Sequence, residues 1–219
     1  DLVRGLGTLA LRDCHWAAGP VSGVLTGGGY GCLGGLVAET RPGSLVVFVD
    51  LGRTLFFQAY GNLAAHPTAL HAEPGAPTWK TAGDATRFVY CSAERAAEVE
   101  GIGADWAISV AAMQEMNEAT VAGYFGVLRR TLAEHNLFYC CSREEKTLVG
   151  GEISRFDDYA WRDEDEILID GEVPWHRFFL SPGRSGRPLR VARVPVPMVR
   201  QFDGPMLHRL VILSADRVE

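Results

Sequence analysis

The stretch "TGGGYGCLGG", from Thr26 to Gly35, contains six glycines in ten residues. Glycine in a folded segment costs about 0.5–1 kcal/mol relative to alanine, so a cluster indicates a sharp turn or a closely approaching ligand. The run "SGVLT" (22–26) predicts a strand, and the apolar spacing over 30–39 predicts a helix. A glycine loop between the first strand and first helix of a parallel sheet is suited to a nucleotide-like ligand, because the helix N-terminus offers free N–H groups.

Apolar runs and helical patterns continue to alternate after this loop. Further strands are predicted over 44–50, 87–91, 105–113, 137–141 and 208–214, and further helices over 53–65 and 117–134. One side of the first of these helices is apolar, formed by Leu55, Phe56, Ala59 and Leu63. Asn117 is placed to cap the second. Strands that alternate with helices in this way predict an α/β fold with a mostly parallel sheet, covered by helices on both faces.

The composition excludes several classes of protein. The 219 residues are 47% hydrophobic and carry a formal net charge of −6, which argues against a nucleic-acid binder. No apolar run approaches the roughly 18 residues of a membrane span, and Arg4 and Arg12 do not fit a secretory signal. The five cysteines include no C-x-x-C pair, so we expect reduced thiols, a cytoplasmic protein and no zinc site.

Asp50 ends the predicted second strand, about 20 residues beyond the glycine loop, where a carboxylate can accept hydrogen bonds from ribose hydroxyls. The simpler alternative is a tight glycine turn beside a helix-capping aspartate. Two ligands fit the glycines. The segment 29–34 matches the dinucleotide pattern G-x-G-x-x-G, and 27–31 matches the G-x-G-x-G loop of S-adenosylmethionine enzymes. The glycines alone do not decide between them.

Longer blocks favour the second ligand. The segments "GGGYGCLGGLVAE", "VFVDLGRTLFFQAYGNL", "QEMNEATVAGYF" and "LFYCCSREEK" resemble successive blocks of the bacterial sugar O-methyltransferase family, over about residues 22–146. This family belongs to the class I methyltransferases. The resemblance implies a Rossmann-like sheet of about seven strands, S-adenosylmethionine as the cofactor, and a sugar or glycosylated small molecule as the methyl acceptor. It also implies one domain over 1–219, with 1–21 as the remnant of a cap, 22–142 as the cofactor-binding core and 143–219 as an elaborated C-terminal part.

The resemblance also assigns the cofactor-binding residues. The residues that would face the methionine part of the cofactor are Gly27, Gly29 and Gly31, and the residue that would hold the ribose is Asp50. Cys91 and Ser92 would lie near the adenine, and the segment Ala111 to Met113 would lie beneath the cofactor. The sequence departs from the family at Leu25, where the family has an acidic residue that orders the loop. Leu25→Glu is therefore expected to tighten cofactor binding, unless the new carboxylate is buried. The family's "NR" pair after the fifth strand is Ser142-Arg143 here.

Methyl transfer to a hydroxyl requires a positioned acceptor and a base for its proton. The candidate bases are His176, which lies between Trp175 and Phe178, and Glu115, which follows the fourth predicted strand; His208 is a weaker candidate. Each could equally be a structural residue.

Three further features have a functional and a structural interpretation. Tyr159, Trp161 and Trp175 could stack on an acceptor, although packing is the favoured interpretation. The acidic run 163–166 could hold a divalent metal, but it is interpreted as solvated surface and no metal is predicted. The arginine-rich segment 177–200 could hold a phosphate or carboxylate of a carrier-linked sugar, but it is interpreted as solvated as well. The alternative functions are an NAD(P)-dependent oxidoreductase, and a catalytically silent module that keeps the cofactor fold as a partner surface.

Overall fold

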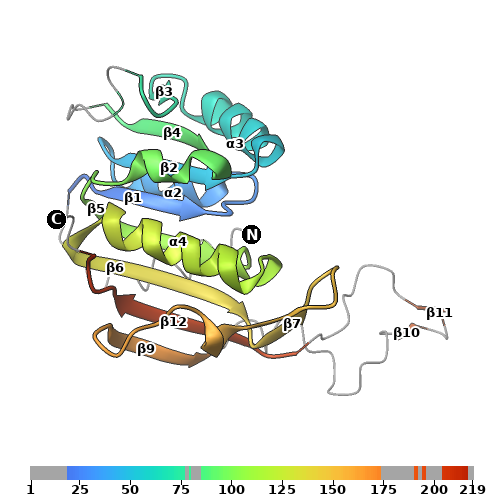
Figure 1. Ribbon diagram of the computed structural model, residues 1–219. Helices are drawn as coiled ribbons and strands as arrows, with labels where there is room; N and C mark the ends of the chain where they lie inside the picture. The colour runs from blue at the N-terminus through green and yellow to red at the C-terminus, as the bar shows by residue number, and fades with distance from the viewer. Residues whose placement is uncertain are drawn as a thin grey trace.

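A computed structural model describes residues 19–76, 79, 85–173, 190–191, 194–195 and 204–216. Within these residues, eight strands form one sheet in the order β3-β4-β2-β1-β5-β6-β12-β9 (Figure 1). Their bounds are β1 Ser22–Thr26, β2 Leu45–Asp50, β3 Leu70–Ala72, β4 Arg87–Ser92, β5 Ala104–Val110, β6 Leu132–Arg143, β9 Glu166–Glu172 and β12 Met206–Ile212. Two separate two-stranded pairs join β7 Glu145–Thr147 to β8 Ile153–Arg155, and β10 Arg190–Val191 to β11 Val194–Pro195.

The sheet is mainly parallel, as predicted. Each neighbouring pair from β3 to β6 is parallel, and β12 runs antiparallel to both β6 and β9. The sheet has eight strands where the resemblance implied about seven, and the two strands that were not located from the sequence are its edge strands, β3 and β9. This is a Rossmann-like α/β architecture.

Helices cover both faces of the sheet. They are α2 Cys32–Thr40, α3 Gly52–Ala65 and α4 Glu118–Thr131, with 3₁₀ turns η1 Ala93–Val99, η2 Met113–Glu115 and η3 Phe156–Asp158. Val37 of α2 packs in one hydrophobic cluster with Val46 and Phe48 of β2. Phe125 of α4 packs in the other cluster, with Val47 of the same strand. Because both faces of β2 are covered, Leu45 to Val49 are all buried, which explains why its sequence is continuously apolar.

The predicted cap of the longest apolar helix is confirmed. Asn117 precedes α4, and its Oδ1 accepts a hydrogen bond of 2.9 Å from the N–H of Thr120. Val121, Phe125 and Leu128 form the buried side of α4. The helix ends at Thr131, three residues before the predicted end, because β6 begins immediately at Leu132.

The apolar side that the sequence gives to α3 is not its buried side. Its buried residues are Gln58 and Asn62, and two residues of the apolar side, Phe56 and Leu63, are exposed. The periodicity correctly located an apolar side, but polar side chains anchor the helix. The physical reason lies in the glycine loop, where the carbonyl oxygen of Gly29 accepts a hydrogen bond from the buried Gln58.

Two other predicted elements have different bounds or surroundings. The strand expected over 105–113 ends at Val110, because Ala111 has a φ of 58° and turns the chain into η2. The acidic run was interpreted as solvated surface, yet Asp165 is buried against Arg129 of α4. No helix of the described part of the chain is both long and apolar enough to cross a membrane.

The aromatic residues of the C-terminal part pack on the sheet. Trp161 lies edge-on to Phe125, with ring centroids 4.9 Å apart, and Tyr159 is buried. The packing interpretation is therefore confirmed for these two residues. Trp175 lies outside the described residues, as do His176 and most of the arginine-rich segment.

Candidate functional site

The C-terminal ends of the parallel strands bring the candidate cofactor residues to one edge of the sheet. Asp50 at the end of β2 is the register partner of Ser92 at the end of β4. Thr26 at the end of β1 pairs with Ser109 of β5, two residues before Ala111. The glycine loop, the aspartate and the residues after β4 and β5 therefore share this edge, where ligands bind in open α/β sheets.

The glycine loop needs its glycines for two different reasons. Gly27, Gly29 and Gly31 have φ values of 68°, 57° and 84°, which disfavour any residue with a Cβ. A Cβ on Gly27 would lie 2.1 Å from the Cβ of Ala112, so this position is also closely packed. A Cβ on Gly29 would meet nothing within 4 Å. Gly29 is thus the point at which the loop faces open space and a ligand can approach its backbone.

Gln58 of α3 joins this loop to Asp50. Its Nε2 donates to the carbonyl oxygen of Gly29 at 3.1 Å and to Oδ2 of Asp50 at 2.8 Å. Both partners accept, so the amide must turn its NH₂ group towards them. The side chain of Gln58 is fully buried. Sequence reasoning missed this residue, since a lone glutamine in an amphipathic helix is normally assigned to the solvent side.

Asp50 is held in place by hydrogen bonds. Its Oδ1 accepts from the N–H of Leu51 at 2.7 Å, and its Oδ2 accepts from Gln58. Partial burial raises the pKa of this carboxyl, and hydrogen bonds from Leu51, Gln58, Thr54 and the backbone of Gly28 oppose the rise. These contacts fix a hydrogen-bond acceptor beside the glycine loop.

Two of the residues expected at the cofactor have side chains in the hydrophobic core. Cys91 is buried, with its Sγ 3.3 Å from the carbonyl oxygen of Arg95, and burial raises the pKa of its thiol to about 11. Met113 is buried in the same cluster. These two side chains pack in the hydrophobic core next to this edge of the sheet. Only the backbone of these two positions is left for contact with a ligand.

Ala111 has a backbone conformation that is unusual for its residue type. Within the described residues it is the only non-glycine residue with a positive φ, 58°. Its N–H donates to the carbonyl oxygen of Cys141 at 2.7 Å, which fixes the turn after β5. Such a conformation costs on the order of 1 kcal/mol and is concentrated at functional sites.

Glu115 lies in η2, beyond this turn. Lys146 of β7 forms an ion pair with its Oε1, and Gln114 Nε2 donates to the same oxygen at 3.1 Å. Burial raises the pKa of Glu115, but the hydrogen bonds from Lys146 and Gln114 outweigh burial, so the pKa lies below its usual range. A carboxylate with a lowered pKa is a weaker proton acceptor. Glu115 is thus anionic but poorly tuned as a base in this arrangement.

Of the other two candidate bases, one lies on β12, three strands along the sheet from β1, and the other lies outside the described residues. His208 lies on β12, where its Nδ1 is 3.2 Å from the hydroxyl oxygen of Tyr139, and burial lowers its pKa. These contacts are those of a structural histidine. His176 lies outside the described residues, so the geometry does not test it.

Leu25 occupies a position that a carboxylate could not share without cost. It is only 1% exposed and lies between its strand neighbours Phe48 and Ile108 in a hydrophobic cluster. The loop that the family's acidic residue would order is instead held by Gln58. A carboxylate introduced by Leu25→Glu would be buried here, so the variant is not expected to tighten cofactor binding.

Comparisons with solved structures bear on the fold. A TehB-like methyltransferase from Corynebacterium glutamicum superposes with a TM-score of 0.53 at 14% identity, over 92% of this chain and 84% of its own length. A candidate sarcosine dimethylglycine methyltransferase from Galdieria sulphuraria gives a TM-score of 0.58 at 12% identity, over 98% and 85%. The fold is that of the class I methyltransferases. Enzymes of this class use S-adenosylmethionine as the methyl donor.

Other comparisons are more limited. No protein-family model matches the chain, and no curated protein matches it. Three further matched methyltransferase structures are much longer, and the chain spans 28% to 37% of their lengths. At 12–14% identity the superpositions establish the class I methyltransferase fold but not the identity of the methyl acceptor.

Proposed function

We propose that this class I methyltransferase fold binds S-adenosylmethionine and transfers its methyl group to a hydroxyl of a sugar or glycosylated small molecule. The observation that carries the proposal is the pairing of Asp50 with the open glycine loop through Gln58. The carboxylate of Asp50 accepts hydrogen bonds at the end of the second strand, beside a loop that faces open space. This arrangement suits a ligand with a ribose and a charged chain attached to it.

The residues present fit the cofactor. Asp50 would accept hydrogen bonds from the ribose hydroxyls, the loop around Gly29 would contact the methionine part, and Ser92 would lie near the adenine. The cofactor itself supplies an activated methyl group on a sulfonium. The protein must therefore mainly align the acceptor hydroxyl with the methyl group and provide a path for the hydroxyl proton.

Support for a sugar acceptor comes from two blocks that carry the family resemblance. The Oε1 of Gln114, in "QEMN", accepts from the N–H of Arg143 in "SR" at 2.9 Å. These segments are separated by 29 positions and meet beside the turn at Ala111. These two segments thus form one local structure at the edge where the acceptor would bind.

The cofactor assignment is tested by ligand-dependent unfolding. S-adenosylhomocysteine should raise the unfolding temperature, since a ligand at about 100 times its Kd adds about 2.7 kcal/mol. NAD and NADP should leave the temperature unchanged. Stabilisation by the dinucleotides alone would establish the oxidoreductase alternative, and stabilisation by none of the three would favour a module that has lost its cofactor.

The role of Gln58 gives a sharper prediction. Gln58→Leu should weaken S-adenosylhomocysteine binding by about 10-fold or more, because it removes a charged hydrogen bond and one to the loop carbonyl, each worth roughly 1–3 kcal/mol. Titration calorimetry on the folded variant measures the change. Arg53→Leu, at an exposed position of the same helix, is the control and should bind normally. Wild-type affinity in Gln58→Leu would mean that the loop does not depend on this amide.

The base remains to be assigned by kinetics. His176→Ala should lower turnover by about 10²–10⁴-fold and leave S-adenosylhomocysteine affinity unchanged, since an unperturbed histidine is mostly neutral and able to accept a proton at pH 7. Glu115→Gln is the comparison, and its ion pair with Lys146 predicts a smaller loss. Full turnover in His176→Ala together with a large loss in Glu115→Gln would reverse the assignment.

A further inference from the structure

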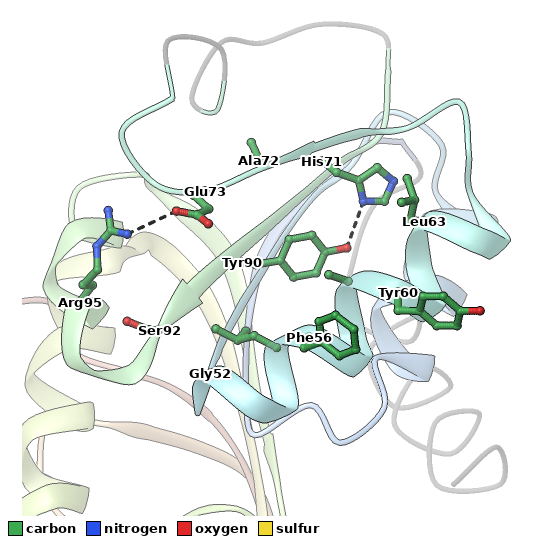
Figure 2. A pocket seen from close by; sticks show the side chains of 12 residues that line it. Gly52, Phe56, Tyr60, Leu63, His71, Ala72, Glu73, Tyr90, Ser92 and Arg95 are labelled. Atoms are coloured by element: carbon green, nitrogen blue, oxygen red, sulfur yellow. Dashed lines mark hydrogen bonds and ion pairs between the residues drawn. The ribbon is translucent and has the colours of Figure 1, made fainter.

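A hollow of about 690 Å³ lies beside α3, on the apolar side of the helix. One side of α3, the strand β3, the end of β4 and the start of η1 enclose it (Figure 2). The volume is within the range of about 300–1,000 Å³ that is usual for small-molecule sites. Ser92 and Gly52 line its end next to Asp50, so the hollow adjoins the candidate cofactor edge without including the glycine loop.

The wall formed by α3 is aromatic. Phe56 and Tyr60 line the hollow and are 67% and 70% exposed. Large apolar side chains that gather on one exposed surface usually mark a binding site. Their exposure follows from the way α3 is anchored. Gln58 and Asn62 face the protein, so the aromatic side must face outward.

The floor of the hollow is a fixed polar pair. Tyr90 and His71 lie with the tyrosine oxygen 3.1 Å from His71 Nδ1, and His71 Nε2 is 3.2 Å from the carbonyl oxygen of His66. A carbonyl oxygen only accepts, so Nε2 carries the hydrogen and Nδ1 of the neutral ring accepts from Tyr90. The hydroxyl group of Tyr90 thus donates its hydrogen to His71, so its oxygen can only accept a hydrogen bond from a ligand.

The rim on the other side carries one carboxylate, Glu73, and one guanidinium, Arg95, which is engaged by Glu98 outside the lining. Arg95 donates to Glu98 through Nε at 2.6 Å and Nη2 at 2.8 Å, and its Nη1 lies 3.6 Å from Glu73. One guanidinium therefore faces two carboxylates. The side chain of Glu73 lines the hollow and is 76% exposed, and within the described residues its one ion pair is the longer contact with Arg95 (Figure 2). A ligand with a positive group can pair with it.

We propose that this hollow is a binding site for a small molecule that combines an aromatic or alicyclic body with a protonated amine. The body lies against Phe56 and Tyr60, where the ring faces also attract a cation, and the ammonium group donates to Glu73 or to the Tyr90 oxygen. A carboxylate or phosphate ligand would find Arg95 already paired with Glu98 and would meet the carboxylate of Glu73 and the Tyr90 oxygen instead. The proposal does not depend on the methyltransferase activity.

The test uses three probes of similar size on the full chain: 2-phenylethylammonium, 2-phenylethanol and phenylacetate. Calorimetric or NMR titration should show the ammonium compound binding at least about 10-fold more tightly than the other two. Glu73→Gln should remove most of the difference between the amine and the alcohol. Glu39→Gln, an exposed carboxylate on α2, should leave that difference intact.

Two adjacent aromatic residues provide the matched control for the wall. Phe56→Ala should weaken binding of the ammonium probe by about 5-fold or more, whereas Phe57→Ala should not, because Phe57 is exposed on the same helix but does not line the hollow. Equal losses in the two variants would mean adsorption to the aromatic surface or self-association through it, and would overturn the proposal.

The remaining outcomes are also decisive. Binding of the ammonium probe should persist when the protein is saturated with S-adenosylhomocysteine, and displacement by that compound would show the hollow to be part of the cofactor site. Tighter binding of phenylacetate or 2-phenylethanol would contradict the charge argument. No detectable binding of the ammonium probe at about 10 mM would contradict the site itself.

Discussion

Leu25→Glu is expected to destabilise the protein by about 4 kcal/mol or more at neutral pH, rather than to order the glycine loop. Leu25 is buried between Phe48 and Ile108, where the variant would lose apolar packing and place a carboxylate without a partner. Loss of a buried leucine alone costs about 2–5 kcal/mol, and an unpaired buried charge adds several more unless the group becomes protonated.

Urea unfolding followed by tryptophan fluorescence measures this effect. Leu25→Met is the control and should cost less than about 1.5 kcal/mol, because it preserves volume and polarity. The loss in Leu25→Glu should shrink as the pH falls, since a protonated carboxyl is cheaper to bury. A folded Leu25→Glu variant with an unchanged urea midpoint and tighter S-adenosylhomocysteine binding would show that the position does reach the cofactor.

Arg129→Met is expected to cost about 3–5 kcal/mol of folding free energy. Arg129 donates through Nη1 to Asp165 Oδ1 at 2.6 Å and through Nη2 to Asp165 Oδ2 at 2.8 Å, and both side chains are 1% exposed. Its Nη1 also donates to the carbonyl oxygen of Ser214 at 2.9 Å, and its Nη2 to that of Ala160 at 3.0 Å. The variant would leave a buried carboxylate without its cation.

The neighbouring residue supplies the control for this variant. Arg130 is partly exposed and pairs with Glu100 and Asp216, so Arg130→Met should cost no more than about 1 kcal/mol. In the double variant Arg129→Met, Asp165→Leu, much of the lost stability should return, because the remaining charge is removed as well. Similar losses in Arg129→Met and Arg130→Met would contradict the special role of the buried pair.

The same pair predicts how stability depends on acid. Burial raises the pKa of Asp165, but hydrogen bonds from Arg129 and from the backbone of Ser214 and Arg162 outweigh it and lower the pKa from 3.8 to about 2. A carboxyl with a lowered pKa in the folded state stabilises the protein above its unfolded pKa. That contribution, about 2 kcal/mol, should disappear as the pH falls from about 4 towards 2, and Asp165→Asn should lack this part of the acid dependence.

The elements that could be predicted from sequence are those in which local pattern and burial agree. The strand β2 is apolar throughout because helices cover both of its faces. The helix α4 begins at a capping Asn117 and keeps one apolar stripe on the core. The glycine loop was located correctly, because its three positive φ values can hardly be met by other residues. The class I methyltransferase fold follows from these elements in their order.

The rest could not be read from the pattern, because polar contacts between distant segments decide it. Gln58 faces the protein only because the carbonyl of Gly29 and the carboxylate of Asp50 lie opposite α3. Asp165 belongs to a run of acidic residues that is typical of an exposed loop. Its ion pair with Arg129 forms only because the fold brings the two segments together. Likewise, Cys91 and Met113 occupy the predicted edge, but strand alternation in β4 and the turn η2 direct their side chains into the core.

The place of β12 between β6 and β9 bears on how the molecule can be assembled during synthesis. β9 is paired in the sheet through β12, which lies more than thirty positions later in the chain. A nascent polypeptide that has reached only residue 200 can pair six parallel strands, but it has no partner for β9 and leaves the edge of β6 open. The carbonyl of Ser214, which Arg129 requires, arrives later still. The first part of the sheet can thus form vectorially, while closure of the second part must wait for the late segment and is the stage most exposed to mispairing.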